Sequence, residues 1–357
     1  DRGYSVAKPL GLLLLSWFMW VLGSLRLVPT NPYTLWVAVI LFSIASIWYA
    51  YRRRKEIIEF IRRERHSILI GEGVFLLVYL AWVLYRAYDP SIDATEQPMD
   101  FAFLNASVLA NFFPPEDPWL RGSDVPYYYF GYLMMGNLTE LTFIPSRISY
   151  NLALALLPAL AATAALGLVY NLIRAHGASA VRAVGFALIA PVLLLLASNL
   201  EGILEFVRLR EWGTNSFWDW LGIKDLIPVE TSSWRPTDYN WWWRSTRGID
   251  SLGPQGNSLD YTITEFPFFS FMLGDLHPHF MSVPFVILFL AVLIVPPRRI
   301  TPTMRSIPIL NWQGDLTLPI TGGLCPMARW ACSGTIMTPL PKPGPARPIC
   351  HAHLTAP

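Results

Sequence analysis

The sequence predicts an all-α fold, a polytopic bundle of about six transmembrane helices joined by two large loops that carry interfacial helices. Three observations predict it: 53% of the 357 residues are hydrophobic, only 15% are charged, and the apolar residues gather in runs of helical length. Soluble domains carry about 25% charged residues, whereas a helix that crosses a bilayer needs about 20 apolar residues. We therefore expect a membrane protein in contact with the lipid bilayer.

Six apolar segments are candidate spans, and the last two reach the required length only with their flanks. They are Pro9–Val28, Tyr33–Tyr51, Ile68–Tyr85, Leu152–Ile173, Ala183–Ser198 and Phe280–Val295. Charged residues are rare within them. Glu72 and Arg26 lie near span ends, where a paired or snorkelling side chain is tolerated.

The distribution of Lys and Arg predicts how the bundle is oriented. Tyr51–His66 holds seven Lys and Arg in 16 residues, which places it on the cytoplasmic side of the cell membrane. Alternation then puts residues 88–150 and 199–279 outside, as two large noncytoplasmic loops of a kind that usually carries function. Because the basic residues gather in one segment rather than across a surface, no nucleic-acid partner is expected.

The first loop contains a predicted helix with an acid in its first turn. Pro98 suits the first helical position, with Gln97 as the cap. Apolar residues at a spacing of three to four suit a helix lying on the bilayer surface: Phe101, Leu104, Val108 and Phe112. Asp100 and Glu96 are candidate general bases, and the alternative for Asp100 is an acid that favours the helix dipole.

Three tyrosines stand in a row farther along the first loop, at Tyr127, Tyr128 and Tyr129. They follow a proline-rich, acidic turn and precede a further Phe, Gly and Tyr. Whether the chain is helical or extended here, the rings project in several directions at the membrane edge. This pattern favours a wall that is apolar on one side and polar on the other.

The second loop ends in a cluster of Glu265, Asp275, His277 and His279, directly before the last span. An extended chain would place Asp275, His277 and His279 on one side. Carboxylate and imidazole groups suit a divalent metal or a phosphate. The alternative is a polar cap that is hydrogen-bonded to backbone carbonyls.

The same loop holds two arginines and many tryptophans. Arg244 and Arg247 are candidate anion ligands, because the planar guanidinium matches phosphate geometry. Seven of the 15 tryptophans lie in this loop. They suit either an interfacial belt or stacking on the faces of sugars.

The last segment differs from the rest. Residues 300–357 contain all three cysteines, abundant Pro and no helical or strand periodicity. We predict a membrane domain at residues 1–299 and an atypical Pro-rich tail at 300–357, either frameshifted or disordered, which is set aside from functional reasoning. The first residues, which lack an initiator Met, indicate a fragment that begins in a loop.

Several strings together resemble a known family. "PMDFAFLNA", "FPPEDPW", "YYYFGY" and "EFPFFSFMLGDLHPHFMSVPF" are similar to the YYY-motif membrane proteins of archaea and Chloroflexi, a domain family of unknown function. The resemblance runs from about Asp1 to Arg299, and the chain looks like a fragment of a family member. More distantly, the family looks like GT-C glycosyltransferases, which are multi-span enzymes with a catalytic acid in the first large outer loop and a polyprenyl-phosphate-linked sugar donor.

This likeness implies a function and a set of roles. Asp100 or Glu96 would be the catalytic base of a membrane glycosyltransferase that works on the noncytoplasmic face. The substrate-binding residues would be Tyr127, Tyr128, Tyr129, Arg244, Arg247, Glu265, His277 and His279. The cofactor stays open, with a divalent metal such as Mg²⁺ or Mn²⁺ at Asp275, His277 and His279 as one alternative. The rival functions are a transporter or lipid flippase, which needs ionisable groups within the spans, and a noncatalytic membrane protein, which does not need the two loops to converge.

Overall fold

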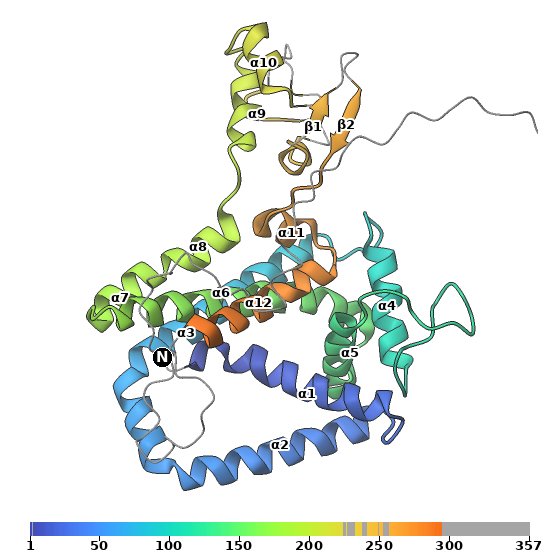
Figure 1. Cartoon of the computed structure of the whole chain (residues 1–357), viewed down its shortest axis with the longest axis vertical. Coiled ribbons are helices and arrows are strands. Elements are labelled where there is room, and N and C mark those ends of the chain that lie inside the picture. Colours follow the sequence, from blue (N-terminus) through green and yellow to red (C-terminus); the bar gives the residue numbers. More distant parts are fainter. Residues whose placement is uncertain are drawn as a thin grey trace, which may run out of the picture. The chain divides into compact units, whose positions relative to one another are not determined.

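The computed structural model describes residues 1, 3–223, 226, 233–237, 241–248, 250–252 and 257–294. The chain divides into two units, Asp1–Pro297 and Arg298–Pro357, and the second lies outside the described residues. The predicted tail at 300–357 therefore stays a prediction. The described part of the first unit is predominantly helical, which confirms the predicted all-α polytopic fold (Figure 1).

The elements follow one another in a simple order, with the long helices first and the short ones in the second loop. They are η1 (Tyr4–Val6), α1 (Ala7–Ser24), α2 (Pro32–Arg52), α3 (Arg54–Tyr88), α4 (Gln97–Leu109), α5 (Phe130–Thr142), α6 (Ser146–Ala175), α7 (Ala180–Ala187), α8 (Ile189–Leu196), α9 (Glu201–Leu209), α10 (Asn215–Leu221), η2 (Arg244–Thr246), β1 (Asp250–Leu252), β2 (Ser258–Tyr261), α11 (Pro267–Leu273) and α12 (Pro278–Ile294).

Four helices are long and apolar enough to cross a bilayer, and they coincide with the first four predicted spans. They are Tyr4–Ser24, Pro32–Arg52, Arg54–Tyr88 and Ser146–Ala175. The third is longer than predicted, because α3 starts in the charged segment and enters its apolar part only near Ile68. The sequence predicts that Glu72 in this helix is either paired or snorkelling, and the structure shows it paired. Lys8 forms an ion pair with it, and the Tyr4 hydroxyl donates to it at 2.9 Å.

The last two predicted spans take a different form. The fifth, at Ala183–Ser198, is divided into α7 and α8, and α9 then bends away from them by 61°. Pro191 gives a physical reason for the division, because proline lacks the N–H that would bond to the Ala187 carbonyl and its ring crowds that carbonyl. The sixth corresponds to α12, which has 17 residues and is about 25 Å long, shorter than a hydrocarbon core of about 30 Å.

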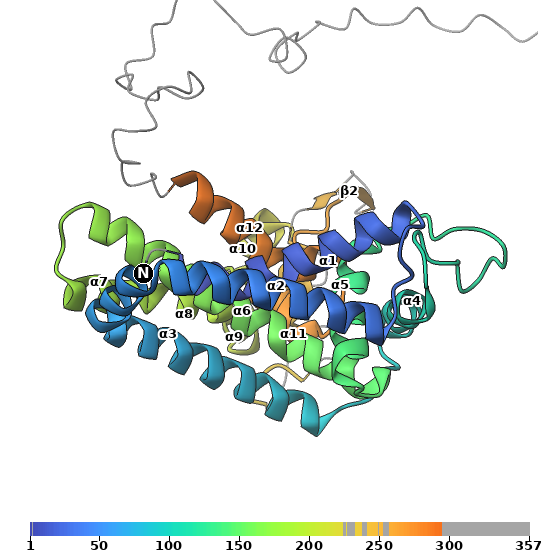
Figure 2. The same cartoon turned by 90° about the horizontal axis from the view of Figure 1, so that it is seen from below.

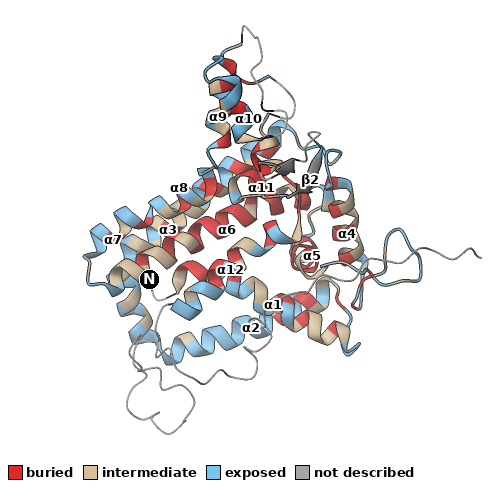
Figure 3. Ribbon diagram, turned by 45° about the horizontal axis from the view of Figure 1, so that its top comes forward, coloured by how far each residue is buried: buried red, intermediate tan, exposed pale blue. Residues whose placement is uncertain are grey.

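Helix α6 lies at the centre of the bundle. Most of its side chains are buried (Figure 3). Its middle is rich in alanine, and small side chains allow neighbouring helices to approach closely. Helix α3 packs along α6, which both views show, and α12 packs against α6 as well (Figure 1 and Figure 2).

Helix α4 confirms the predicted interfacial helix with a shift of one residue at its start. The N-cap is Glu96, so Gln97 is the first helical residue rather than the cap, and its side chain donates to the Gly274 carbonyl at 3.3 Å. The helix ends at Leu109, before Phe112. One face packs against α5 and buries Asp100 and Leu104.

The second loop is held together by contacts between short elements. Strands β1 and β2 pair antiparallel, and the Thr264 N–H donates to the Thr246 carbonyl at 2.9 Å. The Trp243 ring meets Phe269 of α11 edge-on at 5.6 Å. Helix α11 and the turn after it lead the chain into α12, next to the start of α4.

Candidate functional site

Asp100 is the most deeply buried acid of the site. It lies in the first turn of α4 and its side chain is fully buried. The Tyr132 hydroxyl of α5 donates to Oδ1 at 2.6 Å, whereas Oδ2 has no hydrogen-bond partner among the described residues. Burial raises the pKa of Asp100 to about 6, although the Tyr132 hydrogen bond acts in the opposite direction. Asp100 is therefore a buried acid with a raised pKa rather than a solvated acid at a helix end.

His277 joins the second loop to the first. Its Nε2 lies 2.5 Å from Oε2 of Glu96, the residue that caps α4. Its Nδ1 lies 3.7 Å from Oδ2 of Asp275. Burial alone would lower the pKa of His277, but the Glu96 hydrogen bond and the charges of Asp100 and Asp275 raise it above its ordinary value. These groups therefore favour the imidazolium form of His277 more than water does.

Asp275 and Glu265 complete the cluster. The Thr95 hydroxyl donates to Oδ1 of the buried Asp275 at 2.5 Å, and burial raises the pKa of Asp275. Glu265 lies 3.0 Å from His279 Nε2, and this hydrogen bond lowers the pKa of Glu265. The rings of His277 and His279 stack at 5.3 Å. The contact between Glu96 and His277 thus joins the first loop to the second.

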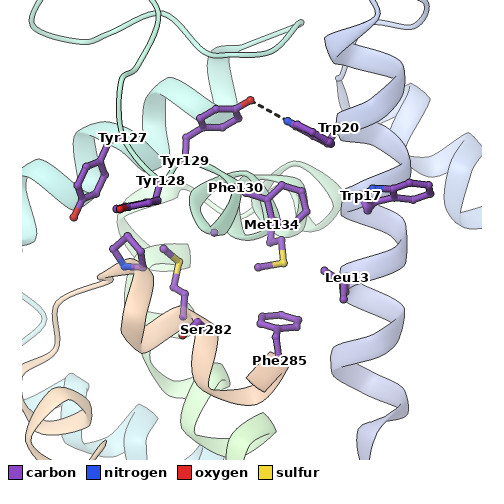
Figure 4. A pocket seen from close by; sticks show the side chains of 13 residues that line it. Leu13, Trp17, Trp20, Tyr127, Tyr128, Tyr129, Phe130, Met134, Ser282 and Phe285 are labelled. Carbon is purple, nitrogen blue, oxygen red and sulfur yellow. Dashed lines mark hydrogen bonds between the residues drawn. The ribbon is translucent and has the colours of Figure 1, made fainter. Parts of the chain in front are cut away.

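The tyrosine motif lines an apolar groove of about 560 Å³ that adjoins this cluster (Figure 4). Its lining comes from α1, α5 and α12 and from the chain that leads into α5: Leu13, Trp17, Trp20, Tyr127, Tyr128, Tyr129, Phe130, Gly131, Met134, Pro278, Met281, Ser282 and Phe285. The Trp20 indole N–H donates to the Tyr129 hydroxyl at 2.9 Å. Pro278 is the residue after His277, so the groove begins next to the charged groups.

Aromatic contacts connect the groove to Asp100. The Tyr127 ring stacks on Phe103 of α4 at 5.3 Å, and Phe103 packs on Tyr132 at 5.5 Å. Gly131 brings α5 close to α12, because a Cβ at this position would lie 2.5 Å from the Met281 methyl group. These contacts explain why the motif combines aromatic rings with a glycine.

Arg244 and Arg247 are held by partners outside this cluster. Arg244 Nε donates to Glu205 of α9 at 2.5 Å, and the Arg247 guanidinium lies over the Trp243 ring at 4.7 Å. Their described contacts thus lie on α9 and η2 rather than on Asp100 or His277. The predicted phosphate role of these two arginines stays a prediction.

The predicted metal at Asp275, His277 and His279 gains no support from the geometry. Among the described residues, no group of three or more His, Cys, Asp or Glu side chains is arranged to hold a metal ion. The chain is not extended here, because α12 begins at Pro278. His277 is turned toward Glu96 and His279 toward Glu265.

Four residues of the site were not predicted from the sequence: Thr95, Gln97 in its present role, Tyr132 and Arg86. Tyr132 carried a signal, because it closes the aromatic motif. Arg86 is a cation directly after an apolar run, which is usually a snorkelling anchor. In the structure its Nε instead donates to Asn151 of α6 at 2.8 Å, and the side chain is buried.

With the geometry established, comparison with known proteins identifies the family. The chain matches the uncharacterized membrane protein family DUF2298 over residues 14–333. The protein belongs to this family. No curated protein and no solved structure matches it. The DUF2298 match confirms the resemblance carried by the tyrosine motif. It also extends past Arg299 into the Pro-rich tail predicted at residues 300–357. Together with the apolar helices, membership in DUF2298 makes this a multi-pass membrane protein.

Proposed function

We propose that this DUF2298 protein is a membrane glycosyltransferase that moves a sugar from a polyprenyl-phosphate carrier to an acceptor hydroxyl. The observation that carries the proposal is the unpartnered, buried Oδ2 of Asp100. Tyr132, Phe103 and Tyr127 connect this acid to a groove with apolar walls. An unsatisfied buried carboxylate is costly to the fold. It is explained if a substrate hydroxyl completes its hydrogen bonding.

The groove suits the lipid part of such a donor. Trp17 comes from α1 and Phe285 from α12, so the rings lie between helices of the bundle (Figure 4). A prenyl chain could pack on these rings, while the tyrosine hydroxyls face its polar end. The polar end would then lie near His277.

Asp100 is suited to act as the general base. A pKa of about 6 leaves it mostly ionised at pH 7 yet basic enough to take a proton. The acceptor oxygen forms a bond to the anomeric carbon while its proton moves to Oδ2. The bond between that carbon and the phosphate oxygen breaks, and polyprenyl phosphate leaves with the electron pair. Attack opposite the leaving group inverts the anomeric centre.

His277 would stabilise the departing phosphate. The pKa of His277 is raised, which favours its cationic form, and a fixed cation near a leaving anion lowers the barrier. Glu96 holds the ring in place at 2.5 Å. Of the two candidate acids, this arrangement favours Asp100 as the base and Glu96 as the residue that orients and charges His277.

The transport alternative has less support. A transporter would place ionisable groups along its spans. In the described spans, Glu72 is already paired with Lys8, whereas the clustered acids and histidines belong to the loops. We further propose that both large loops face the noncytoplasmic side.

The test is lipid and glycan mass spectrometry in cells that lack the gene, complemented with the wild-type protein or with Asp100→Asn. We expect a polyprenyl-phosphate sugar to accumulate and one glycan to disappear in the deletion. The wild-type protein should reverse both changes and Asp100→Asn should reverse neither. Unchanged lipid and glycan profiles in the deletion strain would contradict the proposal.

A further inference from the structure

Arg86 is a buried cation without an acidic partner. It lies in the last turn of α3 and is 7% exposed. Its Nε donates to Asn151 Oδ1 at 2.8 Å and its Nη2 to the Ser91 carbonyl at 3.0 Å, and both acceptors are neutral. The nearby Asp89 is exposed and accepts from the Ser91 N–H instead. Within the described residues, Arg86 forms no ion pair.

This contrasts with the other buried arginine of the described chain. Arg208 is 2% exposed and lies 3.1 Å from the carboxylate of Glu205. Removing a guanidinium from water is expensive, and proteins usually compensate for it with an opposite charge. The dipole at the C-terminus of α3 offsets only part of this cost at Arg86.

The free end of Arg86 points to the candidate site. Its Nη1 would lie 3.2 Å from a Cβ on Gly274, and Gln97 Nε2 would lie 3.6 Å from the same point. Gln97 and Asp100 lie three residues apart on α4, so they share a helix face. Gly274 precedes Asp275 directly. The guanidinium therefore lies beside the turn at Gly274 and the start of α4.

Nη1 is also available to a ligand. The described hydrogen bonds of Arg86 are made by Nε and Nη2, and none is made by Nη1. Its neighbour Gly274 has no side chain to cover it, and a φ of +77° favours glycine there.

We propose that Arg86 binds the phosphate group of the lipid carrier. This assignment deepens the proposed transfer reaction and rests on it for the identity of the anion. A phosphate oxygen at Nη1 supplies the missing negative charge, and a guanidinium binds such an oxygen through a charge-assisted hydrogen bond. Arg86 thereby takes the role that the sequence suggested for Arg244 and Arg247.

The test compares binding of undecaprenyl phosphate and of uncharged undecaprenol to the full chain in nanodiscs of neutral lipid. Native mass spectrometry gives the ratio of the two affinities. We expect the wild-type protein to prefer the phosphate, and Arg86→Gln to reduce that preference about 10- to 100-fold. Arg86→Lys, which keeps the charge, should retain part of it.

Asn151→Ala is the matched control. It removes the partner of Arg86 Nε and the contact from the Asn151 amide to the Pro90 carbonyl, at 3.1 Å, but keeps the cation. If Arg86 serves only to fasten α3 to α6, Asn151→Ala and Arg86→Gln should lower thermal stability by similar amounts. The phosphate preference should then be the same in both variants. That outcome, or a wild-type protein without preference, overturns the assignment.

The result is independent of catalysis. An Arg86-dependent phosphate preference in a protein that transfers no sugar would retain the anion site and remove only the proposed reaction. If the protein transfers sugar and Arg86→Gln leaves the phosphate preference unchanged, the proposed reaction is retained and the anion site at Arg86 is removed.

Discussion

At the scale of single residues, the two oxygens of Asp100 have different surroundings and therefore different roles. Oδ1 is fixed by Tyr132 at 2.6 Å, and Oδ2 is free among the described residues. A base held by one oxygen presents the other in a defined direction, which is the preorganisation that proton transfer needs. The pKa of His277 is raised as well, which favours its cationic form. The site thus combines a base, Asp100, with a cation, His277.

This pairing predicts a bell-shaped dependence of transfer on pH. The rate should rise with pH through about 6, because Asp100 must lose its proton to act as a base. It should fall at higher pH, above the raised pKa of His277, as the imidazolium loses its proton. Initial rates of sugar transfer across the pH range measure both limbs. A rate that is flat from pH 5 to pH 7 would contradict the assignment of Asp100.

The buried acid also predicts a change of stability with pH. The pKa of Asp100 is raised on folding, so the folded protein favours the neutral form more than the unfolded chain does. Its contribution to stability is complete below about pH 4 and is lost as the pH rises to about 6, which amounts to about 3 kcal/mol. Thermal unfolding of the solubilised protein should show this loss for the wild type and not for Asp100→Asn.

Tyr132→Phe should move the acidic limb of the rate profile to higher pH. The Tyr132 hydrogen bond lowers the pKa of Asp100, so its removal lets burial raise that pKa further. At pH 6 we expect a loss of about tenfold in rate. Tyr129→Phe is the control, because its hydroxyl accepts from Trp20 and does not contact Asp100. If the two variants show the same dependence of rate on pH, Tyr132 does not set the pKa of the catalytic base.

Asp100→Asn and Glu96→Gln should have different effects. Loss of the general base should cost about 10²–10⁴-fold in rate, with membrane insertion intact. Loss of the Glu96 charge should cost less and should move the alkaline limb to lower pH, because Glu96 raises the pKa of His277. If only Glu96→Gln is inactive, the base is Glu96. Near-normal transfer by both would leave the Asp275–His279 segment as the place of the chemistry.

At the scale of elements, the site is built where three helix ends meet. Helix α4 starts at Gln97, α11 ends before Gly274, and α12 starts at Pro278. The sequence could predict each boundary from its Pro or Gly, because these residues act locally. It could not predict that the ends meet, because contacts such as Glu96 with His277 span 181 positions.

The same distinction explains the arginines. The sequence singled out Arg244 and Arg247 because a planar guanidinium matches phosphate geometry. Their partners on α9 and η2 became visible only with the tertiary contacts. Arg86 had the sequence signature of an anchor at a span end, and its burial depends on α6 and on the turn at Gly274. Local patterns therefore predicted the four long helices and α4, but not the partners of the cations.

Gly274→Ala tests the turn between α11 and α12. Its φ of +77° is strained for alanine, which costs about 1–2 kcal/mol. The added methyl would also lie 3.2 Å from Arg86 Nη1, so the guanidinium must move. Gly177→Ala is a matched control, because Gly177 has a φ of +82° and nothing within 4 Å of its Cβ position. Both should lower thermal stability, and only Gly274→Ala should also reduce the preference for undecaprenyl phosphate.

At the scale of the whole molecule, charge and groove position give a consistent orientation. Helices α2 and α3 meet at Arg53, in the most basic part of the chain, and the ring of Trp48 lies 5.3 Å from the Arg52 guanidinium. Tryptophan and arginine together are typical of a membrane surface. Helix α3 ends at Tyr88, near the acids of α4, so the site belongs to the opposite surface.

This orientation predicts a labelling pattern. With Cys325, Cys332 and Cys350 replaced by Ser, the chain has no other cysteine, so a single new one can be labelled by a membrane-impermeant maleimide. In intact cells, Asp93→Cys and Arg121→Cys should react, because both positions are exposed and lie in the first large loop. His66→Cys and His176→Cys are exposed as well but lie on the opposite surface, so they should react only after the membrane is permeabilised. The reverse pattern would put the groove and Asp100 on the cytoplasmic side, where the donor would have to be presented from the inner leaflet.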